Sequence, residues 1–206
     1  TPALGASVNP AIIYAAKKCG VKEIYKTGGA HSIAALTYGT KTFKKVDKIV
    51  GPGNTFVTSA KKEVFGEVGI DMIAGPSEVS IVADKDSNPD WVASDLIAQA
   101  EHDILAQSIL ITNNKKLIES VNKSLKLQLL NLPKKKIARK SIKNFGLAIY
   151  ANSQTKILDA INTIAPEHLE ISFNGYKNIL KKIKNAGSIF IGKFSPEAMG
   201  DYLAGP

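Results

Sequence analysis

Residues 79–112, VSIVADKDSNPDWVASDLIAQAEHDILAQSILIT, carry the clearest pattern of fold class in the sequence. This stretch begins with an apolar run at residues 79–83 and ends with another at residues 108–112, and both have the length and composition of buried strands. Residues 89–101, which lie between these runs, have the length of a helix and start at a proline, which favours the first helical position. A strand, a helix and a second strand predict two parallel strands joined by a crossover.

Helix-like and strand-like segments alternate along the rest of the chain in the same way. Further strands are expected at residues 23–26, 46–50, 70–73, 147–150, 169–173 and 188–191. Further helices are expected at residues 11–18, 30–35, 55–65, 115–130, 153–163 and 176–184, and residues 131–136 are expected to form a basic loop. This alternation predicts an α/β fold with a mostly parallel, doubly wound sheet and a boundary between two lobes near Gly75.

Three glycine-containing turns each follow an expected strand. They are Gly28-Gly29, Gly51-Pro52-Gly53-Asn54 and Gly75-Pro76-Ser77. They are therefore expected at the carboxyl edge of the sheet, where folds of this class bind ligands. The second turn precedes a helix whose free N–H groups suit an anion, but it contains no complete phosphate-binding fingerprint. A plain strand-to-helix turn remains an open alternative there.

The overall composition is that of an ordinary globular protein. Of the 206 residues, 44% are hydrophobic and 22% are charged, which excludes wholesale disorder and fibrous repeats. The single cysteine, Cys19, excludes an intrachain disulfide framework and suits a reducing compartment. No apolar run is long enough to span a bilayer, and the first residues do not resemble a signal peptide. A cytoplasmic protein with no membrane partner is expected.

The basic charge could indicate nucleic-acid binding. The formal net charge is +9, but Arg139 is the only arginine, and the lysines are spread along the whole chain. Arginine dominates base and phosphate recognition, and no aromatic residues are interleaved with these lysines as a stacking platform would need. A solvated basic surface is therefore expected, with no nucleic-acid partner. The alternative, a basic nucleic-acid-binding domain, rests on the charge alone.

Chemistry-bearing side chains occur in three short motifs. In Gln99-Ala100-Glu101-His102 the first and last residues share a helix face, so they can converge on one ion. Pro166-Glu167-His168 places a carboxylate beside an imidazole, the usual groups for activating water and transferring protons. Asp201 could add a metal carboxylate. Together they suggest metal-assisted chemistry, although a helix-terminal histidine and exposed turns are alternatives for each motif taken alone.

Taken together, the motifs resemble the histidinol dehydrogenase family. In order along the chain, the resemblance is carried by GGA at 28–30, VDKIVGPGN at 46–54, IDM at 70–72, AGPSEV at 74–79, DL at 95–96, QAEH at 99–102, APEHL at 165–169 and GDY at 200–202. It covers the whole chain, which corresponds to the middle of the family's longer polypeptide. The chain also starts without a first strand and stops in a glycine-rich turn, so it is expected to be part of something longer.

The resemblance implies an NAD-dependent oxidoreductase of histidine biosynthesis. Such an enzyme oxidises L-histidinol to L-histidine through L-histidinal and is a zinc-containing, cytoplasmic homodimer whose site is shared across subunits. The implied fold has two Rossmann-like lobes with mostly parallel, doubly wound sheets, incomplete at both ends. Residues 1–75 would form part of the NAD-side lobe, and residues 76–206 the lobe with the zinc and catalytic residues.

The same resemblance implies the site residues. Glu167 and His168 match the catalytic pair, and the zinc ligands are matched by Gln99, His102 and Asp201. These three ligands, together with Ser77 and His168, also match substrate contacts, and Asn54 and His31 match NAD contacts. His31 stands where the family commonly has glutamine, and an imidazole cannot present an amide's donor and acceptor together.

A fourth zinc ligand is implied to be a histidine of the partner subunit. Residues 1–206 alone are therefore expected to be inactive. An alternative within the same family is a truncated, non-catalytic fragment that binds NAD or a partner without turnover.

Overall fold

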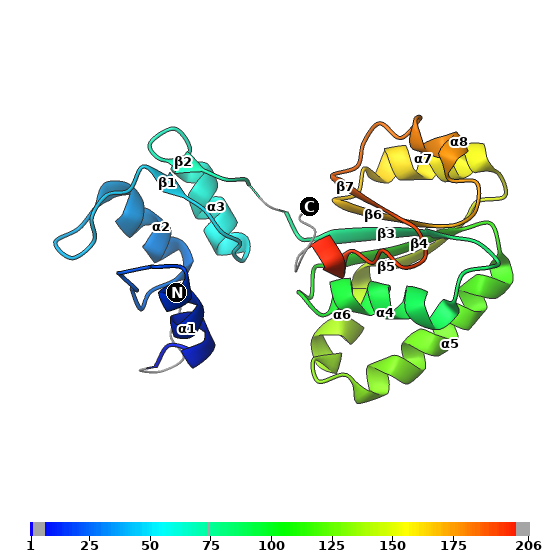
Figure 1. Cartoon of the computed structure of the whole chain (residues 1–206), viewed down its shortest axis with the longest axis horizontal. Helices are drawn as coiled ribbons and strands as arrows, with labels where there is room; N and C mark the ends of the chain where they lie inside the picture. The colour runs from blue at the N-terminus through cyan, green and yellow to red at the C-terminus, as the bar shows by residue number, and fades with distance from the viewer. Residues whose placement is uncertain (2–6, 74, 201–206) are drawn as a thin grey trace. The chain divides into compact units, whose positions relative to one another are not determined.

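The computed structural model describes residues 1, 7–73 and 75–200, and it divides the chain into two compact units, Thr1–Gly75 and Pro76–Pro206. The elements alternate in type, and every strand pairing between named strands is parallel (Figure 1). The predicted α/β class with mostly parallel sheets is confirmed. No helix within the described ranges is both long enough and apolar enough to span a membrane.

The first unit combines three helices with a short parallel strand pair. Its elements are α1 (Pro10–Lys18), α2 (Gly29–Tyr38), β1 (Lys48–Ile49), α3 (Thr55–Glu63) and β2 (Gly69–Ile70). Buried Ile33, Ile49, Val64 and Val68 form its small core. The strand expected at residues 23–26 is wrong. That segment has no strand partner among the described residues, and Tyr25 instead stacks on Phe43 with ring centroids 4.4 Å apart.

The second unit contains a five-stranded parallel sheet in the order β5-β4-β3-β6-β7. The strands are β3 (Glu78–Ala83), β4 (Gln107–Thr112), β5 (Gly146–Tyr150), β6 (His168–Ser172) and β7 (Ser188–Ile191). One face carries α4 (Pro89–Ala100), α5 (Lys115–Asn131) and α6 (Lys135–Phe145), and the other carries α7 (Gln154–Ile164) and α8 (Lys177–Leu180) (Figure 1). Both faces are covered, as a doubly wound sheet requires.

The apolar side chains of β3 divide between the two faces because strand residues alternate in direction. Val79 and Ile81 pack under α4, whereas Val82 belongs to the core beneath α7. Helix α4 begins where the sequence indicates: Asn88 Oδ1 accepts the N–H of Asp90, and Pro89 occupies the first turn. Helix α6 was not predicted. Its buried Ala138 and Ser141 are three residues apart, the helical spacing that would have revealed it.

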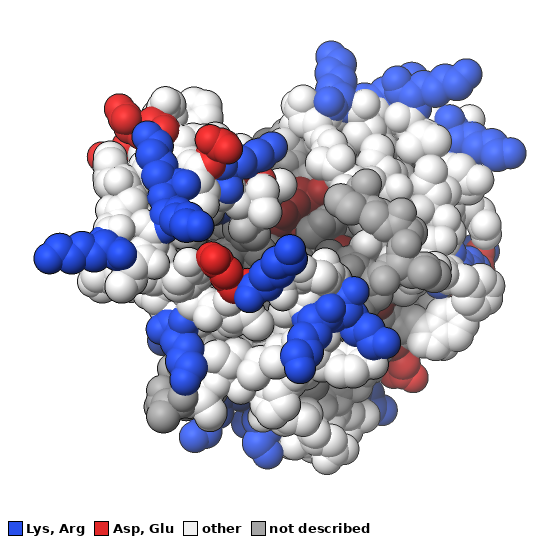
Figure 2. All heavy atoms as spheres, turned by 60° about the vertical axis from the view of Figure 1, so that its left-hand side comes forward, with Lys and Arg blue, Asp and Glu red and all other residues white. Residues whose placement is uncertain are grey.

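The lysines are dispersed over the surface. Figure 2 shows their side chains as separate projections across the visible face, without a continuous basic stripe on it. This distribution agrees with the solvated basic surface expected from the sequence.

Candidate functional site

The candidate site residues of the second unit lie at the amino edge of its sheet. Ser77 directly precedes β3, Glu167 directly precedes β6, and His168 is the first residue of β6. Gln99 is in the last turn of α4 and His102 lies just beyond it, before β4 begins. Asp201 lies outside the described residues.

This placement corrects the expectation of a site at the carboxyl edge for the turn at Ser77. That turn leads into β3 of the five-stranded sheet, so it approaches the sheet at its amino edge. Helix α4 returns the chain to the same edge because a crossover helix runs antiparallel to the strands that it joins. The Gly28-Gly29 turn does not follow a strand in the described residues. The Gly51 turn follows β1 and the Gly75 turn comes after β2, as expected.

Neighbouring strand starts are joined by hydrogen bonds along this edge. The N–H of Glu78 donates to Glu167 Oε2 at 3.3 Å, and Gln107 Nε2 donates to Glu78 Oε1 at 3.1 Å. Partial burial, and next the negative charge of Glu167, raise the pKa of Glu78. The exposed Glu167 carboxylate is therefore oriented by β3 while it remains accessible to a ligand.

The turn between α7 and β6 fixes the backbone conformation of Glu167 and His168. Helix α7 is capped by Ala165, whose φ of 51° lies in the left-handed region that a non-glycine residue rarely adopts. The Glu167 carbonyl then accepts the N–H of Ser188 at 2.8 Å. A Cβ on Gly187 would lie 2.5 Å from that same carbonyl oxygen, so only glycine fits here. The catalytic pair implied by the resemblance therefore lies on a tightly held backbone.

His168 has an acidic neighbour that the sequence analysis missed. Its Nδ1 atom lies 3.7 Å from Glu197 Oε1, and the two side chains are 13% and 6% accessible. Nδ1 has no hydrogen bond within the described residues. Two more acids lie near this pair, the buried Glu170 and the half-buried Asp95. The signal in the sequence was Glu170 itself, a charged residue within the apolar strand His168–Ser172.

Two of the three expected zinc ligands, Gln99 and His102, lie within the described residues. Gln99 is 1% accessible, and neither its amide oxygen nor its amide nitrogen has a hydrogen-bond partner in the described part of the chain. Buried polar atoms without partners are rare in proteins, so this amide suits a ligand. His102 is exposed nearby, and the carboxyl end of α4 is the negative end of the helix dipole, which favours a cation.

No group of three or more His, Cys, Asp or Glu residues in the described ranges could hold a metal ion by itself. Gln99 and His102 nevertheless fit the role of partial ligands to an ion completed by other residues.

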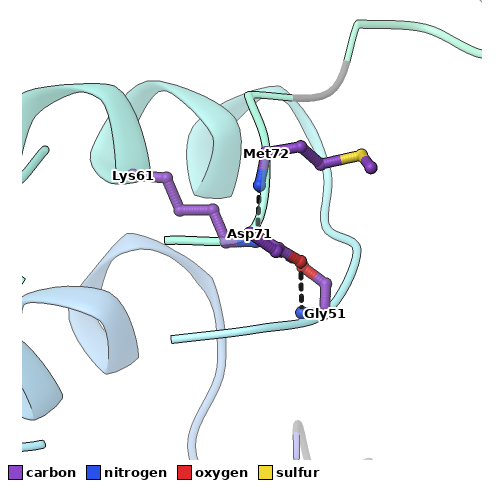
Figure 3. Close-up of polar contacts among 4 residues, drawn as sticks. All are labelled: Gly51, Lys61, Asp71 and Met72. Carbon is purple, nitrogen blue, oxygen red and sulfur yellow. Dashed lines mark hydrogen bonds and ion pairs between the residues drawn. The ribbon is translucent and has the colours of Figure 1, made fainter. Parts of the chain in front are cut away.

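In the first unit, an ion pair holds the turn between β1 and α3. Lys61 Nζ donates to Asp71 Oδ1 at 2.6 Å and to the Gly51 carbonyl at 2.5 Å. The other Asp71 oxygen, Oδ2, accepts the Gly51 N–H at 2.7 Å (Figure 3). The Lys61 ammonium, followed by the N–H groups of Gly51 and Met72, lowers the pKa of Asp71 well below its usual range.

The two expected NAD contacts lie on neighbouring helices of this unit. Asn54 caps α3: its Oδ1 accepts the N–H of Val57, which leaves its amide nitrogen without a hydrogen bond among the described residues. His31 is exposed in the first turn of α2, which packs against α3. No hydrogen bond joins these two side chains in the described structure.

Comparison with known proteins shows what this chain resembles. The family model described as histidinol dehydrogenase matches residues 1–206. Histidinol dehydrogenase of Pelagibacter ubique is 60% identical over 198 residues, covering 96% of this chain and 46% of that protein. The Listeria monocytogenes serovar 1/2a histidinol dehydrogenase is 54% identical over 206 residues, covering 100% of this chain and 48% of that protein.

The solved structures agree. The crystal structure of histidinol dehydrogenase from Elizabethkingia anophelis superposes with a TM-score of 0.90 at 44% identity, covering 98% of this chain and 46% of that one. The chain spans about half the length of the curated relatives that it matches. Because the family model covers every residue, this chain belongs to the histidinol dehydrogenase family.

Proposed function

We propose that this chain forms the central part of an NAD-dependent, zinc-containing dehydrogenase that oxidises L-histidinol to L-histidine through L-histidinal in the cytoplasm. One observation supports this proposal above the others. Within a family match that covers the whole chain, Ser77, Glu167 and His168 lie at one edge of one sheet, and α4 delivers Gln99 and His102 to that edge. We also propose that the enzyme is a homodimer, in which a histidine of the partner subunit completes the zinc site.

The residues have separate proposed roles. Gln99, His102 and Asp201 would hold the zinc ion, and Asn54 and His31 would contact NAD. When bound, zinc supplies a positive charge that orients the substrate, and NAD accepts a hydride in each oxidation. Ser77 would orient the substrate at the start of β3. In this arrangement the second unit performs the proton chemistry, and the first contributes to cofactor binding.

His168 would act as the general base in the first oxidation. It takes the proton of the substrate hydroxyl while the carbinol carbon gives up its hydride, which leaves the aldehyde. Glu167 would then accept a proton from water as the water oxygen attacks the aldehyde carbon. The resulting hydrate loses a second hydride and becomes the carboxylic acid. Glu167 is exposed, which suits a group that activates water. His168 is half-buried, which suits a base that is shielded from water.

The test uses a full-length chimera, in which residues 1–206 replace the matching segment of the Pelagibacter ubique relative. With L-histidinol and NAD it should form NADH, lose this activity when treated with a chelator, and regain it with added zinc. The chimera carrying His168→Ala is the matched control for a folded but impaired site. A folded, zinc-loaded chimera without NADH formation would overturn the proposal, and NAD binding without turnover would favour the non-catalytic alternative.

A further inference from the structure

A group of acidic side chains lies near His168, on the face of the sheet covered by α4. Glu170 follows His168 by two residues on β6, so both side chains point to the same face. Their register partners on β3 are Val79 and Ile81, which belong to the core beneath α4. The imidazole is therefore backed by the interior of the second unit.

Asp95 and Glu170 are neighbours within this group of acids. Asp95 extends from α4 and is half-buried, whereas Glu170 extends from β6 and is buried. Burial raises the pKa of both groups, and the neighbouring Asp95 raises that of Glu170 further. Two neighbouring carboxylates repel each other, so the arrangement favours a pair in which one carboxyl group keeps its proton.

Glu170 also holds the segment that follows β7. Its Oε1 accepts the backbone N–H of Glu197 at 2.6 Å in a buried hydrogen bond. The same segment packs Phe194 on Trp91 of α4, with ring centroids 5.3 Å apart. A buried carboxyl group and an aromatic contact thus set the position of the Glu197 backbone.

The Glu197 side chain lies beside the imidazole of His168. Glu197 Oε1 is 3.7 Å from Nδ1, which is a close ionic contact but longer than a hydrogen bond. Polar contacts of catalytic groups are often long without substrate and shorten when it binds. Since Nδ1 is buried and has no hydrogen bond within the described residues, it needs an acceptor, and Glu197 is the carboxylate within reach.

We propose that Glu197 is a positioning residue for His168, held in place by Glu170. Its carboxylate accepts a hydrogen bond from the Nδ1–H group, which keeps the proton on Nδ1 and leaves Nε2 unprotonated to take the substrate's proton. Glu197 itself does not touch the reacting atoms. The reaction that it assists rests on the proposed function, whereas the contact with the imidazole does not.

The first test measures the tautomer of the His168 imidazole in the 206-residue chain. The chain contains three histidines, so the signal of His168 is the one that disappears in His168→Ala. Nitrogen NMR should find His168 in the tautomer protonated on Nδ1, and Glu197→Gln should remove this preference. Glu119→Gln, which neutralises an exposed acid on α5, should leave it unchanged. Identical His168 signals in the native chain and Glu197→Gln would overturn the proposal, whatever the protein catalyses.

The second test measures NADH formation by the full-length chimera. Glu197→Gln should lower kcat about ten- to a hundredfold with little change in KM for L-histidinol. Glu197→Asp, which keeps the carboxylate, should recover part of the loss. Glu119→Gln, which alters an exposed acid on α5, should retain full kcat. Full kcat in Glu197→Gln would overturn the proposal, whereas a native chimera without turnover would overturn the proposed function instead.

The pH profile separates positioning from a structural effect. The acidic groups around His168 come from every neighbouring element: Glu197 after β7, Glu170 on β6, Asp95 on α4, Glu167 before β6 and Glu78 on β3. If Glu197 acts on the imidazole, Glu197→Gln should change the acid limb of kcat/KM, because the imidazole then lacks its neighbouring carboxylate. A lower rate with an unmoved acid limb would indicate a structural role only and would overturn the proposal.

Discussion

The ammonium nitrogen of Lys61 lies 2.6 Å from Asp71 Oδ1, and the Lys61 side chain is only 5% accessible. Lys61 belongs to α3 and Asp71 directly follows β2, so this ion pair joins a helix to the end of a strand. Both residues also bond the backbone of Gly51 (Figure 3). The turn that precedes α3 is thus held by charge as well as by its own backbone.

Replacing Asp71 by Asn should destabilise the first unit. The buried Lys61 ammonium would lose its counter-charge, which we expect to lower the free energy of unfolding by about 2 kcal/mol near neutral pH. Because folding lowers the pKa of Asp71, its stabilisation is complete above the ordinary carboxyl range, near 3.8, and is lost as the pH falls below it. Urea unfolding of the 206-residue chain at several pH values measures both effects.

Asp47→Asn is the matched control, since Asp47 is exposed and forms no side-chain ion pair in the described structure. Equal destabilisation by the two substitutions would contradict the role of the ion pair. The role of the ion pair would also be contradicted if the free energies of unfolding of Asp71→Asn and the native chain differed by the same amount in acid as at neutral pH.

Glu170→Gln should stabilise the second unit in mildly alkaline solution. Folding raises the pKa of Glu170, so the native state binds more protons than the unfolded state above about pH 4.5, and stability falls as the pH rises. Glutamine keeps the hydrogen bonds of the protonated acid without this cost. The melting temperature of the variant should exceed that of the native chain near pH 8, and the difference should shrink towards pH 5. A constant difference across this range would show that ionisation of Glu170 is not its cause.

Gln99→Met should separate metal binding from folding. Both polar atoms of the Gln99 amide are buried without partners, and methionine has a similar shape without them. In the metal-free chimera the substitution should raise the free energy of unfolding by about 1 kcal/mol, while the zinc content after loading falls. Gln107→Met, which breaks the bond to Glu78, should not stabilise the protein. A Gln99→Met variant that retains its zinc would remove Gln99 from the ligands.

Glu167 and His168, the proposed catalytic pair, should respond differently to the two proposed substrates. In the chimera, His168→Ala should slow oxidation of L-histidinol by about 10²–10⁴-fold, since it removes the base for the hydroxyl proton. Glu167→Gln should slow oxidation of L-histidinal more than that of L-histidinol, since water is needed only at the aldehyde. NADH formation measured with each substrate separately tests this. Equal effects of Glu167→Gln on both substrates would refute the division of roles.

The order and type of most elements could be predicted from the amino-acid sequence, because these depend on local patterns. The apolar runs at β3 and β4 and the proline at the start of α4 are read from neighbouring residues, and they predict a parallel α/β sheet. The motifs around Gln99 and Glu167 are also local strings, so the family resemblance could be recognised before the fold was known. The strand expected at residues 23–26 failed because a strand needs a partner, which no local pattern supplies.

The edge of the sheet that carries the candidate site, and the acids near His168, could be found only from the folded arrangement. Ser77 and Glu167 are 90 residues apart in sequence, yet strand pairing between β3 and β6 places them at the same amino edge of the sheet. Glu197, Glu170 and Asp95 come from a turn, a strand and a helix, and no spacing rule links them. The raised pKa values of Glu170 and Asp95 and the contact of Glu197 with the imidazole arise from burial and through-space proximity, which depend on the folded arrangement.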